Sequence, residues 1–243
     1  MKKLISAIIV LIALTGCASS TSVQESEKVS RISSSPIDPE ILGRWENESN
    51  GYYFSENRKV SLIIDFSYMG NYFTPEGDFQ MAGGLMKKDQ NITYDGTNLN
   101  IIYDFYDETD NTTYSQFILC MQRTDEPNTE SYDGTYTVLS GACIQAVSDI
   151  IGMSIEDIIN NITLEAEIRD DSFIITAQDY CDYETNENCL ELFSQYMNYI
   201  DESATSVKYD YKIEDDSLTL NYIGSSDSPA EIYKRVEETS AKE

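Results

Sequence analysis

Three stretches of this chain share one form, in which an alternating run is followed by a tight turn and a second alternating run. β-branched and aromatic residues dominate the runs, a composition that favours strands. The turns read Asp-Gly or Asp-Asp-Ser, and Asp and Gly tolerate the positive φ angles that a hairpin turn needs. The sequence therefore predicts β-hairpins, and a mainly antiparallel β fold, from residues 92–102, 164–175 and 209–220.

Two further segments extend this pattern. Residues 60–66 are rich in β-branched and aromatic side chains and predict a strand. Residues 107–111 are acidic and predict another hairpin tip, because they lack the spacing of an EF-hand calcium loop.

Two segments interrupt the β pattern with helical spacing. In residues 144–159, isoleucine and valine recur at three- and four-residue steps, which predicts an amphipathic helix that Gly152 divides. Ser154, with Asp157 three residues later, forms a capping pattern for the second part. Similar apolar spacing predicts another helix over residues 186–200.

The chain contains no histidine. Ser-His-Asp and Cys-His nucleophile systems, together with the commonest metal ligand, are therefore excluded. Paired carboxylates can still act as acid and base in glycoside hydrolysis, but among 43 acidic residues such pairs are expected by chance. No pattern nominates a catalytic pair, a metal site or a cofactor, so we expect that the protein is not an enzyme.

The charge balance excludes another class of partner. The chain has 16 basic and 43 acidic side chains, a formal net charge of −27. A nucleic-acid-binding surface needs a patch of Lys and Arg that displaces counterions from phosphates. The basic residues here are scattered, and we expect no nucleic-acid partner.

The first seventeen residues have a distinctive layout. Lys2 and Lys3 precede an apolar run that is too short to span a bilayer, and this run ends in Leu-Thr-Gly before Cys17. On these residues the segment resembles the signal of a bacterial lipoprotein. The resemblance implies that residues 1–16 are a signal peptide and that Cys17 is lipidated. Acyl chains on Cys17 would attach the protein to a membrane of the cell envelope, facing outside the cytoplasm.

Residues 17–40 follow as lipid anchor and tether. Residues 18–40 hold eight serines, two prolines and no aromatic residue. Such a composition buries too little apolar surface to offset the entropy cost of ordering the chain. We expect a disordered tether that ends where the β pattern begins.

Four cysteines remain once Cys17 is assigned to lipid. An even number outside the cytosol makes disulfides plausible, and four cysteines allow three connectivities. We favour bridges between Cys181 and Cys189 and between Cys120 and Cys143. The alternative is free buried thiols, whereas a zinc site would need closer pairs than this sequence offers.

The β-rich region contains two successive segments, here called the first and second pass, that begin and end with similar residues. Gly43-Arg-Trp45 opens the first and Gly134-Thr-Tyr136 the second, while late arginines at Arg123 and Arg235 close them. On these residues the chain resembles lipocalin-like (calycin) proteins, and the second pass resembles the short lipocalin-like domains of bacterial surface lipoproteins. The resemblance implies that an arginine of the last strand packs on the aromatic ring of the first. It pairs Trp45 with Arg123 and Tyr136 with Arg235 as structural barrel-closing residues.

Two arrangements of these passes remain open. In the first, residues 41–124 and 132–238 form two small barrel or sandwich modules of about five strands each, the second with helical insertions and the acidic residues 124–133 acting as a linker. In the second, both passes close one larger β-barrel of about ten strands.

Three functions follow from these features. The first is a non-enzymatic, membrane-anchored extracytoplasmic protein that binds a small ligand or an envelope component. The second is a surface adhesion or protein-interaction module, which would use exposed tyrosines such as Tyr52, Tyr53, Tyr68 and Tyr72. The third is a carboxylate-dependent hydrolase.

Overall fold

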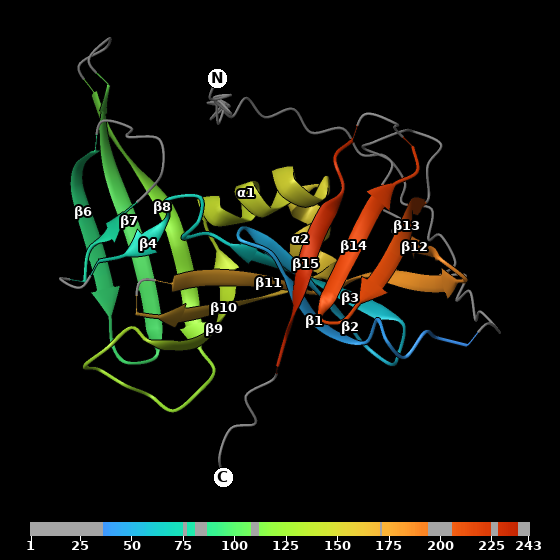
Figure 1. Cartoon of the computed structure of the whole chain (residues 1–243). Helices are drawn as coiled ribbons and strands as arrows, with labels where there is room; N and C mark the ends of the chain where they lie inside the picture. Colours follow the sequence, from blue (N-terminus) through green and yellow to red (C-terminus); the bar gives the residue numbers. More distant parts are fainter. Residues whose placement is uncertain are drawn as a thin grey trace, which may run out of the picture. The chain divides into compact units, whose positions relative to one another are not determined.

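One long antiparallel sheet carries most of the fold (Figure 1). The computed structural model describes residues 36–74, 77–80, 87–107, 112–170, 172–193, 206–224 and 228–237. The predicted signal peptide, Cys17 and most of the tether lie outside these residues. Within the unit Ser35–Glu243, thirteen strands form the main sheet, and the short strands β4 and β5 pair with each other.

The strands of the main sheet follow the predicted alternation of apolar and polar residues. In chain order they are β1 (Gly43–Glu46), β2 (Asn50–Phe54), β3 (Lys59–Asp65), β6 (Lys87–Tyr94), β7 (Asn98–Asp107), β8 (Thr112–Arg123), β9 (Gly134–Ser140), β10 (Thr163–Arg169), β11 (Ser172–Asn186), β12 (Cys189–Phe193), β13 (Ser206–Glu214), β14 (Ser217–Tyr222) and β15 (Glu231–Val236). The separate pair is β4 (Tyr72–Phe73) and β5 (Phe79–Gln80).

Eight of these strands close into an antiparallel barrel. Their order is β12-β13-β14-β15-β1-β2-β3-β11, and β11 pairs with β12 to complete the ring. An eight-stranded barrel has an interior just wide enough for side chains to fill. Here inward-facing residues of all eight strands form one core, which includes Phe54, Val60, Tyr183, Leu190 and Leu218.

The remaining strands, β10-β9-β8-β7-β6, continue the sheet beyond β11 and surround a second core. Helices α1 (Ala142–Ile151) and α2 (Ile155–Asn161) supply part of that core through Ile144, Val147 and Ile158. The fold is therefore mainly β, with an eight-stranded closed barrel and additional strands, as the sequence predicted in its coarse form.

Strand β11 belongs to both parts of the sheet. Its first half pairs with β10 and its second half with β12, while β3 pairs with both halves on the other side. The register with β3 shifts between Ala177 and Cys181, and Asp179 within this bulge has a φ of 50°. A bulge increases the local bend of a strand, which allows one strand to serve two sheets of different curvature.

The predicted hairpins are confirmed. Strands β6 and β7, β10 and β11, and β13 and β14 pair as antiparallel neighbours. Asp170 and Asp215 adopt positive φ angles of 54° and 53° in the last two turns. Strands β7 and β8 also form a hairpin, but the tip at residues 108–111 lies outside the described residues.

The divided helix is confirmed as well. Gly152 ends α1 in the left-handed conformation with a φ of 67°, and Ser154 caps α2 by accepting a hydrogen bond of 3.1 Å from the Asp157 backbone N–H. The predicted helix over residues 186–200 is wrong in its described part. Leu190 and Leu192 alternate into the barrel core from β12, because closing the ring requires a strand between β11 and β13. Residues 194–200 lie outside the described residues.

The predicted boundary at residues 124–133 does not divide the sheet. Strands β8 and β9 pair with each other across this segment. Strands β1 and β3, from the first pass, pair with β15 and β11 from the second. The closed barrel is therefore assembled from both ends of the described chain.

Trp45 is clamped at one end of the barrel. The guanidinium carbon of Arg235 lies 4.1 Å from the Trp45 ring centroid. Arg235 also donates hydrogen bonds of 2.7 and 2.5 Å to the carbonyls of Leu42 and Glu40, and the Trp45 indole N–H donates one of 2.7 Å to the carbonyl of Ile41. We call this arrangement the Trp45 clamp.

Tyr136 is held by the same arrangement in the second part of the sheet. The Arg123 guanidinium carbon lies 5.6 Å from the Tyr136 ring centroid, and its nitrogens donate to the carbonyls of Asp133 (2.6 Å) and Ser131 (3.4 Å). The Tyr136 hydroxyl donates to the carbonyl of Tyr132 at 2.5 Å. In both clamps the aromatic residue bonds the carbonyl four residues earlier, and the arginine bonds carbonyls one and three residues before the glycine.

The predicted partners of these four residues are exchanged. The lipocalin-like resemblance implied that Trp45 pairs with Arg123 and Tyr136 with Arg235, and both pairs are wrong. Trp45 is directly opposite Arg235 on β1 and β15, and Arg123 is directly opposite Tyr136 on β8 and β9. The reason is that each clamp forms between adjacent strands, and the strand beside β1 comes from the end of the chain.

Replacing Arg235 with alanine is expected to lower the free energy of unfolding by roughly 2 to 4 kcal/mol, since it removes a cation–π contact and two charge-assisted hydrogen bonds. Urea unfolding followed by the fluorescence of Trp45, the single tryptophan, measures this loss. Arg169→Ala is the matched control, because that side chain is exposed and forms a surface ion pair with Glu167; it should change stability by less than about 0.5 kcal/mol. Equal effects of the two variants would contradict the structural role of the clamp.

Candidate functional site

The end of the barrel that holds the Trp45 clamp is closed by the chain that leads into β1. The Asp38 backbone N–H donates to the Thr185 hydroxyl at 3.1 Å, and the Tyr211 hydroxyl donates to the Asp38 carboxylate at 2.7 Å. With Ile41 fully buried beside them, these bonds fix residues 38–41 across the barrel end. A functional site inside the barrel must therefore be reached from the opposite end.

Tyrosines line that opposite end. β-strand alternation places every second residue inside. On β2, β13, β14 and β15 the inward residues toward this end include Tyr52, Tyr209, Tyr222 and Tyr233, together with Val207 and Glu231. We define the tyrosine cluster as Tyr52, Tyr180, Cys181, Tyr209, Tyr222, Glu231 and Tyr233.

Direct contacts connect Tyr52, Tyr233 and Glu231. The rings of Tyr52 and Tyr233 lie 5.3 Å apart at an interplanar angle of 62°. The Tyr233 hydroxyl donates to the Glu231 carboxylate at 2.5 Å. On the neighbouring strands, the rings of Tyr209 and Tyr222 lie 6.0 Å apart at 57°.

The bulge of β11 adds Tyr180 and Cys181 to this end of the barrel. Cys181 belongs to the barrel core, and Tyr180 packs against that core. Both Tyr52 and Tyr180 pack against the barrel core and against the second core. The tyrosine cluster therefore lies where the two cores meet.

Burial keeps these groups protonated. Desolvation is the main cause that raises the pKa of Tyr209 and that of the Cys181 thiol to about 12 each. Burial also raises the pKa values of Tyr52, Tyr180 and Tyr233 above the ordinary tyrosine value, with the negative charge of Glu231 adding to the effect at Tyr52 and Tyr233. At neutral pH the cluster therefore offers neutral phenols and a neutral thiol, which donate hydrogen bonds but are poor bases and nucleophiles.

The cluster nevertheless remains in reach of solvent. Tyr52, Tyr180 and Tyr209 are half-buried, and Glu231 is exposed. Tyr222, at the end of β14, is 37% exposed. The accessible groups at this end of the barrel are therefore the rings of Tyr209 and Tyr222 and the carboxylate of Glu231, whereas Tyr233 is fully buried.

A separate hollow of about 230 Å³ lies between β9, the start of β10 and the two helices. It is lined by apolar side chains and two threonines: Thr137, Val138, Leu139, Ile144, Ile158, Ile159, Ile162, Thr163 and Leu164. None of these side chains is ionisable near neutral pH, so the lining of the hollow offers no general acid or base.

The described part of the chain contains no group of three or more Cys, Asp or Glu residues placed to hold a metal ion. Neither described helix is long and apolar enough to cross a membrane. Carboxylates are plentiful in the sequence, but the tyrosine cluster contains only one, Glu231.

The four cysteines after Cys17 are free thiols in the structure. The predicted Cys181–Cys189 bridge is wrong, because Cys189 pairs with Asn186, five residues beyond Cys181 on β11. Five residues of extended strand span about 16 Å, whereas bridged cysteines need Cα atoms within about 7 Å.

The predicted Cys120–Cys143 bridge is likewise not formed. Cys143 lies in the second core on α1, and burial raises its pKa to about 12, with a smaller contribution from Cys120.

The four tyrosines suggested for a surface patch do not share one face. Tyr53, Tyr68 and Tyr72 are exposed, but Tyr52 is adjacent to Tyr53 on β2 and points to the opposite side, into the barrel. Sequence reasoning therefore grouped Tyr52 with the wrong neighbours. The alternation of Tyr209 and Tyr211 on β13 was a usable signal for inward tyrosines, whereas the contact of Tyr52 with Tyr233 depends on the pairing of distant strands.

Comparisons with protein-family models, with curated proteins and with solved structures find no match to this chain.

The tyrosine cluster makes the stability of the barrel sensitive to alkaline pH. Because folding raises the pKa of Tyr209 from 10.0 to about 12, this tyrosine contributes stability that is complete below pH 10 and is lost as the pH rises toward 12. Urea midpoints should fall across this range, and tyrosinate absorbance should show a late-ionising fraction. Tyr209→Phe should reduce that fraction. Ionisation of every tyrosine near pH 10 without loss of the fold would contradict this assignment.

Proposed function

We propose that this protein is a lipid-anchored, extracytoplasmic binding protein without enzymatic activity, whose barrel takes a small ligand or an envelope component at its tyrosine-lined end. The observation that carries the ligand part is the tyrosine cluster itself. It combines aromatic faces, protonated hydroxyls and a carboxylate at the barrel end opposite the Trp45 clamp. Such a mixture of apolar lining with a few placed polar groups is typical of ligand sites.

The anchor part of the proposal is supported by the N-terminal sequence. A basic start, an apolar run and Leu-Thr-Gly before Cys17 match the layout of a lipoprotein signal. Two or more acyl chains give lasting attachment, since each buried methylene contributes about 0.8 kcal/mol.

We further propose that the two parts of the sheet are related lipocalin-like modules. The support is that each holds a Gly-x-aromatic strand beneath an arginine, with the same offsets to backbone carbonyls. The two modules differ in the chain order of these strands. In the barrel the Gly-x-Trp strand β1 precedes the arginine strand β15, whereas in the second part the arginine strand β8 precedes the Gly-x-Tyr strand β9.

The absence of enzymatic activity is supported by the chemistry of the cluster. Its phenols and thiol are protonated at neutral pH. Glycoside hydrolysis by paired carboxylates needs a second carboxylate within about 5 to 9.5 Å, and among the residues of the cluster Glu231 is the single acid.

A second candidate function is protein interaction through the apolar hollow. Leu139 and Ile159 line it and are 48% and 58% exposed. Exposed apolar surface that borders a depression is characteristic of interaction sites. Ligand binding remains the better supported proposal, because the tyrosine cluster adds polar groups that can orient a small molecule.

Replacing Cys17 with serine is expected to release the protein from membranes, since serine lacks the thiol that carries the acyl chain. In cells that process lipoproteins, wild type should enter the detergent phase on phase partitioning and Cys17→Ser the aqueous phase. Cys189→Ser is the control and should behave as wild type. Membrane association that persists in the Cys17→Ser variant would contradict the anchor.

Replacing Tyr222 with leucine is expected to weaken ligand binding about threefold to tenfold, the value of one aromatic contact. Tyr53→Leu is the matched control, because Tyr53 is equally exposed, at 36% against 37%, but lies on the outer face of β2. A panel of cationic, neutral and anionic small molecules, screened by saturation-transfer NMR on the full chain, supplies the ligands. Binding that neither variant alters, or no binding by any class, would overturn the ligand part of the proposal.

A further inference from the structure

We propose that the ligand of the tyrosine cluster is a small organic cation, bearing a primary or quaternary ammonium group. This inference rests on the proposed binding function and names the chemical class of the ligand. It is carried by the charge of Glu231, by the ring geometry of Tyr209 and Tyr222, and by the exposure of these three residues.

Negative charge dominates the cluster. Glu231 is the carboxylate that acts most strongly on Tyr52, Tyr209 and Tyr233. The positive charge of Lys59 acts on Cys181, and its ammonium nitrogen is already 2.5 Å from the Asp182 carboxylate. An anionic ligand would therefore meet an opposing carboxylate, whereas an ammonium group would be attracted to it.

The rings are placed to add to this attraction. The rings of Tyr209 and Tyr222 lie 6.0 Å apart with their planes inclined by 57°, so each ring covers at most one face of the other. Tyr209 is half-buried and Tyr222 is 37% exposed, whereas Tyr233 is fully buried. A cation within about 6 Å of an uncovered ring face gains about 0.5 to 2 kcal/mol. The ring faces stay neutral and electron-rich, since burial keeps these phenols protonated.

The charge of the whole chain acts in the same direction. A net charge of −27 raises the local concentration of cations around the protein and speeds their association at low salt. A neutral polyol would use the phenols but gain nothing from Glu231 or from the net charge. An organic cation would be attracted by the phenol rings, by Glu231 and by the net charge of the chain.

The test compares two probes of one shape and different charge. Choline and its neutral isostere, 3,3-dimethyl-1-butanol, are titrated into the full chain by isothermal calorimetry, with tyrosine fluorescence as a second readout. Choline is expected to bind about tenfold or more tightly than the isostere, and added salt should weaken choline binding but not isostere binding.

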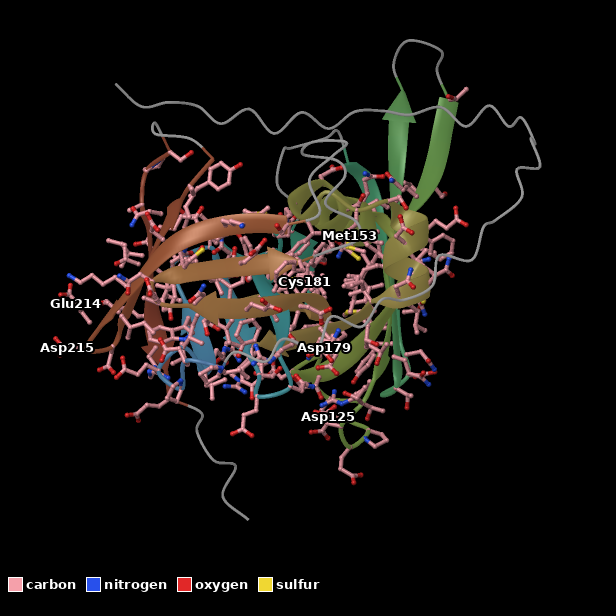
Figure 2. The ribbon with its side chains drawn as sticks, turned by 90° about the vertical axis from the view of Figure 1, so that its right-hand side faces the viewer. Asp125, Met153, Asp179, Cys181, Glu214 and Asp215 are labelled. Carbon is pink, nitrogen blue, oxygen red and sulfur yellow. The ribbon has the colours of Figure 1, made fainter. Side chains whose placement is uncertain are left out.

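A pair of charge variants locates the effect. Glu231→Gln should weaken choline binding about tenfold and leave the isostere unchanged. Glu214→Gln removes a carboxylate from the β13–β14 hairpin, which Figure 2 shows at the edge of the molecule, away from Cys181, and it should leave both probes unchanged. Buried Trp45 at the closed end reports whether each variant keeps the barrel folded.

The outcomes separate this inference from the proposed function. If the isostere or an anionic probe binds as tightly as choline, or if a folded Glu231→Gln variant binds choline as wild type does, the cation assignment is wrong while ligand binding stands. If no probe of any charge binds, the proposed ligand-binding function is itself overturned. If Glu231→Gln fails to fold, the comparison of choline with its neutral isostere on the wild-type protein still decides whether the site prefers a cation.

Discussion

The same interaction occurs at two places in this fold. An arginine lies over an aromatic ring and donates hydrogen bonds to backbone carbonyls that precede a glycine. In the Trp45 clamp, Arg235 connects the last strand to the first and bonds the carbonyls of Leu42 and Glu40. The glycine is required because Gly43 has a φ of 103°, a region that side chains disfavour. Closure of the barrel at this end leaves the opposite end as the accessible one, so the position of the tyrosine cluster depends on the clamp.

The sharing of β11 is the second constraint. Because this strand pairs with β10 in its first half and with β12 in its second, the two cores meet along it, and the bulge near Asp179 turns Tyr180 and Cys181 toward the barrel. Tyr52 and Tyr180 then pack against both cores. Phenols in this position are surrounded by protein yet half-accessible, a combination that suits binding more than catalysis.

Local features were predictable and long-range ones were not. The Asp turns, the alternation of β10 and β13 and the Ser154 cap depend on neighbouring residues, whose conformational preferences are visible in sequence. The residues of both clamps were recognised, but Arg123 and Arg235 were assigned to each other's rings, since strand pairing between distant segments follows from closure of the sheet. The segment that became β12 has helical spacing in sequence, and only its position between β11 and β13 makes it a strand.

The sequence by itself determined a mainly β chain, excluded histidine-based chemistry and selected the glycines, rings and arginines of the clamps. Each of these depends on the type of a residue or on a short spacing. The tertiary structure decided which arginine meets which ring, that β1 to β3 join strands from the far end of the chain, and that Tyr52 faces Tyr233 beside Glu231. These outcomes depend on the free energy of closing an eight-stranded ring around a filled core, a property of all its strands together.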